Sequence, residues 1–377
     1  MKFSEVVGQE RVKEIFHKYM ESGKIPHAIM LCGPMGSGKL PMALALATYL
    51  CCTNRTPDGD SCGECPSCVK MNNLAHPDVH FAFPIVKKKA GRNSVCDEFL
   101  PLWRETLLRE SYITPENWVD ALQAGNTQPI IYSTESDEIQ RKLSLKSSQG
   151  GYKVMIIWMP EKMNQECANK MLKILEEPPG QTAFILVSEQ PDLLLPTILS
   201  RVQRINLPPV EEEALVKYLI DRYMLVDEDA RDVARRSEGS ISNALENIRL
   251  SDRRKNFFDL FVRLMRLSYA RDIRSLRDWS DELAQSGREM QKDFINYSLN
   301  LIRENFVYNF HRTEMVYLSP VERQFATRFA PFISEKNVIG IMELLDEGGA
   351  MIEQNVSAKM VFFDMALRMI VLIKQFK

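Results

Sequence analysis

Two patterns of apolar and polar positions alternate over the first half of the chain. Residues 10–21 place apolar side chains three and four positions apart, which predicts an amphipathic helix. Short, nearly continuous apolar runs further along predict strands buried on both faces, as in a parallel sheet covered by helices. These runs are 28–32, 154–158 and 184–187. A second helix, over 168–175, is expected to end before Pro178 because proline cannot continue it.

Beyond residue 207 the apolar spacing is helical throughout. The last helix is expected to bury one apolar stripe, whose members are three and four positions apart. The stripe consists of Ile352, Val356, Met360, Phe363, Leu367 and Ile370. A chain of 377 residues is too long for one core. We therefore predict an α/β domain over 1–207, followed by two helical blocks over 208–252 and 253–377.

The segment from about 84 to 128 fits neither pattern and is predicted to be an insertion in the α/β domain. It carries scattered aromatic residues and the basic run Lys87-Lys88-Lys89. Such a run is usually a solvated face, and a contact with DNA is the alternative. The sequence assigns no function to this segment.

The composition is that of an ordinary globular protein, because 45% of the residues are hydrophobic and 26% are charged. A net charge of −2 excludes a global basic field, so a contact with DNA would need a local patch or partner chains. The N-terminus lacks the apolar stretch of a secretory signal. The longest dense apolar run, Val154–Met159, is far too short to span a membrane. We therefore expect a cytoplasmic protein with no membrane partner.

The first predicted strand leads into a glycine-rich turn, GPMGSGKL, that precedes a helical pattern. Strand, turn and helix in this order are the context of a phosphate-binding loop (P-loop). Gly33, Gly36 and Gly38 would let backbone amides turn toward phosphate oxygens, and Lys39 would reach the β- and γ-phosphates. A serine or threonine that binds Mg²⁺ belongs at the position of Leu40. The alternative is a glycine-rich turn that binds nothing.

Active P-loop ATPases carry carboxylates at the end of the second predicted strand, for Mg²⁺ and for the attacking water. Here those positions hold Trp158 and Met159, and the nearest carboxylate, Glu161, lies beyond a proline. Metal ligands stabilise charge in the transition state, so their loss predicts no Mg²⁺ and no ATP hydrolysis by this chain. Retention of ATP or ADP at Lys39 is left open.

Five of the eight cysteines fall between Cys51 and Cys68. In an intracellular protein this clustering indicates a metal site rather than disulfides. Four thiolates from one loop leave no open position on a tetrahedral ion, so a structural Zn²⁺ is predicted, with an iron–sulfur cluster as the alternative. The predicted ligands are Cys52, Cys62, Cys65 and Cys68. Cys51 competes with Cys52 for the fourth place, and Cys32 and Cys167 are expected core residues.

Four stretches of the chain together resemble the AAA+ clamp-loader family of bacterial DNA polymerase III, and within it the delta prime subunits. They are the glycine-rich turn, the cysteine loop, LKILEEPP at 172–179 and TILSR at 197–201. The opening VVGQE at 6–10 is also similar, and the resemblance covers roughly residues 1–250.

This resemblance implies an AAA+ module with a zinc insert, a helical lid over 208–252 and a helical collar over 253–377. The implied partners are gamma/tau and delta type subunits in a hetero-pentamer, the sliding clamp and primed DNA. The implied task is to load the clamp during DNA replication, at a replisome associated with the nucleoid.

The resemblance also implies a role in trans for Arg201. In the family, the arginine of a Ser-Arg-Cys motif reaches the ATP of the adjacent subunit, where a guanidinium neutralises transition-state charge. Here Val202 replaces the cysteine, whereas the arginine is retained. A surface ion pair is the alternative for Arg201. A second departure lies near Ser242, where active relatives carry an arginine that senses their own nucleotide.

Two other functions compete with a non-hydrolysing loader subunit. An ATP-hydrolysing AAA+ subunit would need the metal ligands that Leu40, Trp158 and Met159 replace. A passive, zinc-dependent nucleic-acid-binding module would need a basic cysteine loop, whereas Asp58 and Asp60 make that loop acidic.

Overall fold

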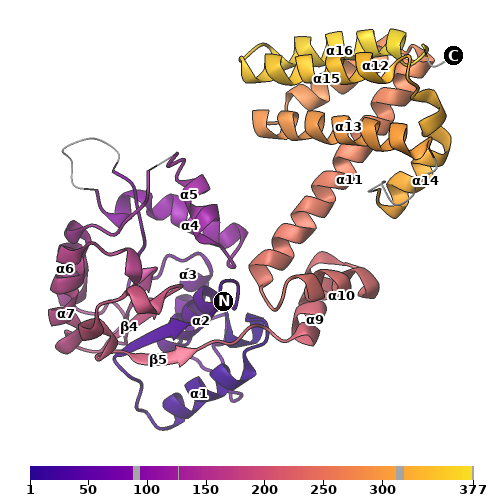
Figure 1. Ribbon diagram of the computed structural model, residues 1–377. Helices are drawn as coiled ribbons and strands as arrows, with labels where there is room; N and C mark the ends of the chain where they lie inside the picture. Colours follow the sequence, from indigo (N-terminus) through magenta and orange to yellow (C-terminus); the bar gives the residue numbers. More distant parts are fainter. Residues whose placement is uncertain (88–93, 126, 311–317, 376–377) are drawn as a thin grey trace. The chain divides into compact units, whose positions relative to one another are not determined.

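The computed structural model describes residues 1–87, 94–125, 127–310 and 318–375. The chain forms two compact units, Met1–Asn247 and Ile248–Lys377 (Figure 1). One helix, α11 (Ile241–Ala270), begins in the first unit and continues into the second. Within the described ranges, no helix combines the length and the apolar character needed to cross a membrane.

A five-stranded parallel sheet, in the order β2-β3-β4-β1-β5, lies at the centre of the first unit. The strands are β1 (Ala28–Cys32), β2 (Val79–Ala82), β3 (Lys153–Trp158), β4 (Thr182–Val187) and β5 (Gln203–Asn206). Every residue of β1, β3 and β4 is buried, which explains their continuous apolar runs. The predicted parallel α/β sheet is confirmed, and the three predicted strands are its central ones. The two edge strands have only four residues each, too few to give a pattern.

The helices of the first unit are α1 (Glu10–Glu21), α2 (Lys39–Cys51), α3 (Pro66–Asn72), α4 (Leu100–Arg109), α5 (Pro115–Ala121), α6 (Ser133–Ser144), α7 (Gln165–Glu176), α8 (Pro196–Leu199), α9 (Glu212–Tyr223) and α10 (Asp227–Arg236). Helix α1 coincides with the predicted 10–21. Helix α2 contacts β1, β3 and β4, and it is buried from Lys39 to Leu50. Helix α7 begins after Asn164, whose side chain accepts a hydrogen bond from the Cys167 amide at 2.8 Å.

The segment predicted to be an insertion contains α4 and α5 and belongs to the core of the first unit. Trp103 on α4 is fully buried, and its ring centroid lies 4.3 Å from Phe83 and 5.2 Å from Trp158. Trp118 on α5 meets Trp103 edge-on and donates its indole N–H to the Pro84 carbonyl at 2.7 Å. Of the basic run, Lys88 and Lys89 lie outside the described residues.

The second unit is helical in all its described elements. Besides most of α11, it contains α12 (Ile273–Ala284), α13 (Arg288–Tyr308), α14 (Pro320–Phe329), α15 (Val338–Glu353) and α16 (Ala358–Leu372) (Figure 1). Its core is built around Trp279, Phe294 and Phe362, which meet one another edge to face.

The predicted stripe of the last helix is wrong. Asn355 has a φ of 66°, a left-handed conformation that ends α15, and α16 starts afresh at Ala358. The interruption changes which positions of the second helix face the core. Met360 is therefore 72% exposed. The buried face of α16 consists of Val361, Phe362, Met365, Ala366 and Met369.

Candidate nucleotide, metal and arginine sites

The glycine-rich turn joins β1 to α2, as the sequence indicates, and packs against the segment before α11. Gly36 and Gly38 adopt φ values of 78° and 91°, conformations that favour glycine. The Gly36 carbonyl accepts a hydrogen bond from the Ile241 amide at 3.0 Å. A Cβ atom on Gly36 would collide with the Ser240 hydroxyl, so this glycine also permits a close approach of two backbones.

Lys39, the predicted phosphate-binding lysine, is turned onto its own chain. Its Nζ donates hydrogen bonds to the carbonyls of Gly33 at 2.8 Å and Pro34 at 2.6 Å. It also forms an ion pair with Glu189 Oε2 at 2.9 Å, and its side chain is only 2% exposed. An ammonium group has three N–H donors. These three partners therefore match its full capacity.

Glu189 was not predicted as a site residue. It follows β4, the strand next to β1, and parallel strands bring their carboxyl ends to one edge of the sheet. Burial raises the pKa of Glu189, whereas the charge of Lys39 opposes this shift. Glu161 fixes the same turn, because its carboxylate accepts from the Ser188 hydroxyl at 2.9 Å and the Glu189 amide at 3.0 Å.

The end of the second predicted strand carries apolar side chains in place of carboxylates. Trp158 ends β3, is 1% exposed and packs against Trp103 of α4. Met159 is buried and donates its amide N–H to the Val187 carbonyl at 2.8 Å.

Tyr112, between α4 and α5, covers the other side of the glycine turn. Its hydroxyl accepts a hydrogen bond from the Val7 amide at 3.0 Å, and its carbonyl accepts one from the Ser242 hydroxyl at 2.9 Å. A Cβ on Gly38 would lie 3.4 Å from the Tyr112 ring. Burial raises the pKa of Tyr112. The inserted segment thus links the N-terminal residues, the glycine turn and the start of α11.

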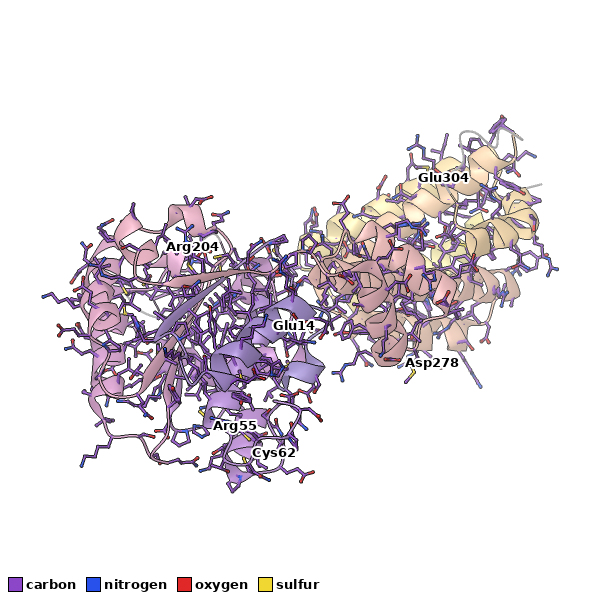
Figure 2. The ribbon with its side chains drawn as sticks, turned by 90° about the horizontal axis from the view of Figure 1, so that it is seen from below. Glu14, Arg55, Cys62, Arg204, Asp278 and Glu304 are labelled. Atoms are coloured by element: carbon purple, nitrogen blue, oxygen red, sulfur yellow. The ribbon has the colours of Figure 1, made fainter. Side chains whose placement is uncertain are left out.

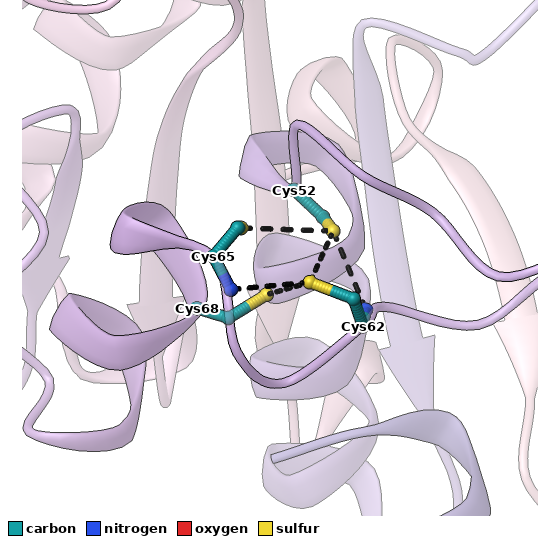
Figure 3. Close-up of side chains that lie close together, drawn as sticks. All are labelled: Cys52, Cys62, Cys65 and Cys68. Carbon is teal, nitrogen blue, oxygen red and sulfur yellow. Dashed lines mark hydrogen bonds between the residues drawn. The ribbon is translucent and has the colours of Figure 1, made fainter.

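The four predicted cysteine ligands converge in one cluster, with all four sulfur atoms within 4.8 Å of one another (Figure 3). The sulfur of Cys62 lies 3.6 Å from that of Cys52 and 3.8 Å from that of Cys68. Sulfurs at the corners of a tetrahedron around Zn²⁺, with bonds of about 2.3 Å, are about 3.8 Å apart. The donors therefore fit a tetrahedral thiolate-bound ion.

Backbone groups support this cluster. The Cys62 amide donates to the Cys52 sulfur at 3.4 Å, and the Cys65 amide donates to the Cys62 sulfur at 3.3 Å. Hydrogen bonds from the amides of Cys65 and Glu64 lower the pKa of the Cys62 thiol, which favours the metal-binding thiolate. Asp60 ties the loop to the N-terminus by accepting from the Phe3 and Ser4 amides, at 3.0 Å each.

Cys51 lies outside the cluster that contains Cys52. Burial, and next the charge of Asp78, raise the pKa of Cys51 to about 12. Cys32 and Cys167 are buried in β1 and α7, as expected of core residues.

Arg201 lies in the turn between α8 and β5, and its guanidinium contacts other residues of the chain. Its NH2 group forms an ion pair with Glu176, the last residue of α7, and its NH1 group donates to the Thr197 carbonyl at 2.7 Å. The predicted alternative, a surface ion pair, therefore exists within the chain. Figure 2 places Arg204, on the neighbouring strand β5, well apart from Cys62.

Comparison with known proteins places the chain in a family. The family model described as DNA polymerase III, delta subunit, matches residues 8–211, more than half of the chain. The chain belongs to this family. It is 27% identical to DNA polymerase III subunit delta′ of Bacillus subtilis over 57% of this chain and 52% of that protein. It is 30% identical to subunit delta′ of Escherichia coli over 60% of this chain and 55% of that protein.

The relatives are not confined to delta′. Subunit gamma/tau of Mycobacterium bovis is 27% identical over 60% of this chain and 33% of that protein. The matches span about half the length of the two delta′ subunits and a third of the gamma/tau subunit. A solved structure of a gamma subunit-related protein from Thermotoga maritima is 16% identical, with a TM-score of 0.37 over 96% of this chain and 99% of that one.

Proposed function

We propose that this chain is a clamp-loader subunit of the DNA polymerase III holoenzyme that does not hydrolyse ATP and supplies Arg201 in trans. In this proposal Arg201 reaches the ATP of a neighbouring subunit while the sliding clamp is loaded onto primed DNA. Membership of the DNA polymerase III delta family supports a role in DNA replication. The assignment as a subunit that does not hydrolyse ATP is supported by the phosphate loop, in which Lys39 is paired with Glu189.

The pairing of Lys39 with Glu189 is the observation that carries the non-hydrolysing assignment. A γ-phosphate would have to displace the carboxylate of Glu189, whose side chain is 17% exposed, from the lysine that should bind it. Leu40 supplies no hydroxyl for Mg²⁺, and apolar Trp158 and Met159 stand where carboxylates are needed. Hydrolysis of ATP at Gly33, Gly36, Gly38 and Lys39 is therefore not part of the proposed task, whereas retention of ATP or ADP there without turnover is compatible with it.

The proposal assigns the cysteine cluster a structural Zn²⁺. Cys52, Cys62, Cys65 and Cys68 leave no open coordination position, so the ion would order the loop without taking part in a reaction. The loop contains few apolar residues of its own, and the ion would supply much of its stability.

The proposal gives the molecule an AAA+ module over 1–207, a helical lid over 208–252 and a collar over 253–377. Its partners would be gamma/tau and delta type subunits in a hetero-pentamer, in the cytoplasm at the replisome. Relatives named as gamma/tau and delta′ subunits support partners within that assembly.

Reconstitution of the complex with Arg201→Ala tests the function. We expect a partial loss of DNA-stimulated ATP hydrolysis, because only one of several ATP sites loses its arginine, and a larger loss of clamp loading. Arg204→Ala is the matched control, since Arg204 is an exposed arginine three residues away. Unchanged clamp loading by a folded Arg201→Ala complex would contradict the proposed role.

A further inference from the structure

The guanidinium of Arg201 is anchored from two directions. Glu176 binds its NH2 group, and the carbonyl of Thr197 and the hydroxyl of Ser200 accept from NH1, at 2.7 and 3.3 Å. Among the described residues, these partners account for three of the five N–H donors of the group. The side chain is one-third exposed, so the remaining donors can still meet a phosphate group from outside.

Glu176 occupies a position that does not favour a carboxylate. It is the last residue of α7, where the helix dipole presents its negative end, and a second carboxylate, Glu177, follows directly. Without a cation nearby, both effects would make two adjacent negative charges unfavourable there. The ion pair with Arg201 compensates one of these charges.

We propose that Glu176 is a positioning residue for Arg201, an inference that rests on the proposed action of Arg201 in trans. A free arginine side chain samples many rotamers, and about 2 kcal/mol of rotamer entropy is lost when it is fixed. Glu176 and the Thr197 carbonyl fix the guanidinium before the neighbouring subunit arrives. The phosphate of that subunit then meets a preorganised group, which is how fixed charges assist a transition state.

The experiment compares Glu176→Ala with Glu177→Ala in the reconstituted complex. Both substitutions remove one carboxylate from the same turn, but Glu177 is exposed and, within the described ranges, has no ion pair. The measured quantity is the Arg201-dependent hydrolysis, defined as the difference in DNA-stimulated turnover between the unchanged and Arg201→Ala complexes. We expect Glu176→Ala to lower it about three- to tenfold, the size of a coupling between contacting side chains. KM for ATP should not change.

A double variant separates positioning from a general structural effect. If Glu176 acts through Arg201, adding Glu176→Ala to Arg201→Ala should lower turnover no further. Equal effects of Glu176→Ala and Glu177→Ala, or a further loss in the double variant, would overturn the inference. So would faster hydrolysis by Glu176→Ala, which would mean that Glu176 restrains the arginine. If Arg201→Ala alone changes neither DNA-stimulated turnover nor clamp loading, the proposed function fails as well. That result does not require any Glu176 variant.

Melting curves and metal content of the isolated variants guard against unfolding. Glu176→Gln replaces Glu176→Ala if the latter does not fold, because it keeps the shape and removes the charge. We expect Glu176→Gln to lower Arg201-dependent hydrolysis as well. An unchanged rate with Glu176→Gln would count against the inference.

Discussion

An ion pair with Glu189 and two hydrogen bonds to backbone carbonyls engage Lys39, the lysine that would bind phosphate in an open site. The sequence places Lys39 after a strand and a glycine turn, and the structure agrees. The sequence could not predict Glu189 as its partner, because that pairing depends on β4 lying beside β1 in the sheet. The order of strands is a property of the whole fold, and no local pattern in either strand encodes it.

Removing the charge of Glu189 should allow Lys39 to bind other anions. We expect Glu189→Gln to bind ADP about tenfold more tightly than the unchanged chain, since one competing charge interaction is worth about 1–2 kcal/mol. Lys39 would lose its ion pair in a buried place, so the melting temperature should fall and should recover in part with ADP.

Titration calorimetry and melting curves with ADP measure both effects. Glu177→Gln is the control, because it removes an exposed carboxylate that lies outside the loop. Equal ADP affinity in the unchanged chain and in Glu189→Gln would show that Glu189 does not close the site.

At the scale of elements, the cysteine loop was more predictable than the inserted segment. The spacing of four cysteines predicted the cluster because a metal site is built from neighbours in sequence. The packing of α4 and α5 was missed because Trp103 and Trp118 meet partners on β3 and after β2 that are far away in the chain. Aromatic residues scattered without a period give no sign of such contacts.

One Zn²⁺ per chain is expected. The ion should be lost when a ligand cysteine is substituted and kept when a neighbouring cysteine is. Cys52→Ser should release the metal and loosen the loop, because three thiolates cannot close a tetrahedral site. Cys51→Ser, one residue away, should keep it, since Cys51 lies outside the cluster. Elemental analysis of purified variants decides. Iron with a visible absorption band would reject zinc, and metal retained by Cys52→Ser but lost by Cys51→Ser would exchange the two roles.

The inserted segment should behave as core and not as a detachable appendage. Trp103→Ala would leave a cavity between Phe83, Trp118 and Trp158, and such truncations cost about 3–5 kcal/mol. Leu108→Ala on the same helix is the control, because Leu108 is 55% exposed and its loss should change stability by about 0.5 kcal/mol or less. Denaturant unfolding of both variants measures the difference. Similar stabilities would mean that α4 is packed only loosely.

At the scale of the whole molecule, the sequence predicted the structural class of each part. The parallel sheet and the helical second unit were both expected. The boundaries at 207 and 252 remain predictions. The stripe of the last helix failed because the left-handed turn at Asn355 divides the expected helix into α15 and α16. Spacings of three and four residues recur by chance in an apolar segment, so the periodicity alone could not reveal the break.

The whole molecule should contribute to ATP hydrolysis only within its assembly. In the isolated chain Leu40, Trp158 and Met159 stand where Mg²⁺ ligands are needed, and Lys39 is paired with Glu189. We therefore expect no Mg²⁺-dependent phosphate release above background. Under the proposed function, adding the chain to gamma/tau and delta type subunits should nevertheless raise their DNA-stimulated turnover, because Arg201 would then reach a neighbouring site. An arginine of this kind accelerates phosphoryl transfer by roughly 10³–10⁵-fold at the site that it serves.

Phosphate release from the isolated chain, from the partners alone and from the complete complex separates the two contributions. Arg201→Ala should cancel the gain at one site while the melting curve and zinc content of the chain stay unchanged, since an exposed ion pair adds little to stability. If the isolated chain hydrolyses ATP and Lys39→Ala abolishes this activity, the assignment as a non-hydrolysing subunit is wrong. That result would make the pairing of Lys39 and Glu189 a resting state of a working site, and the role of this chain would then lie at its own phosphate loop.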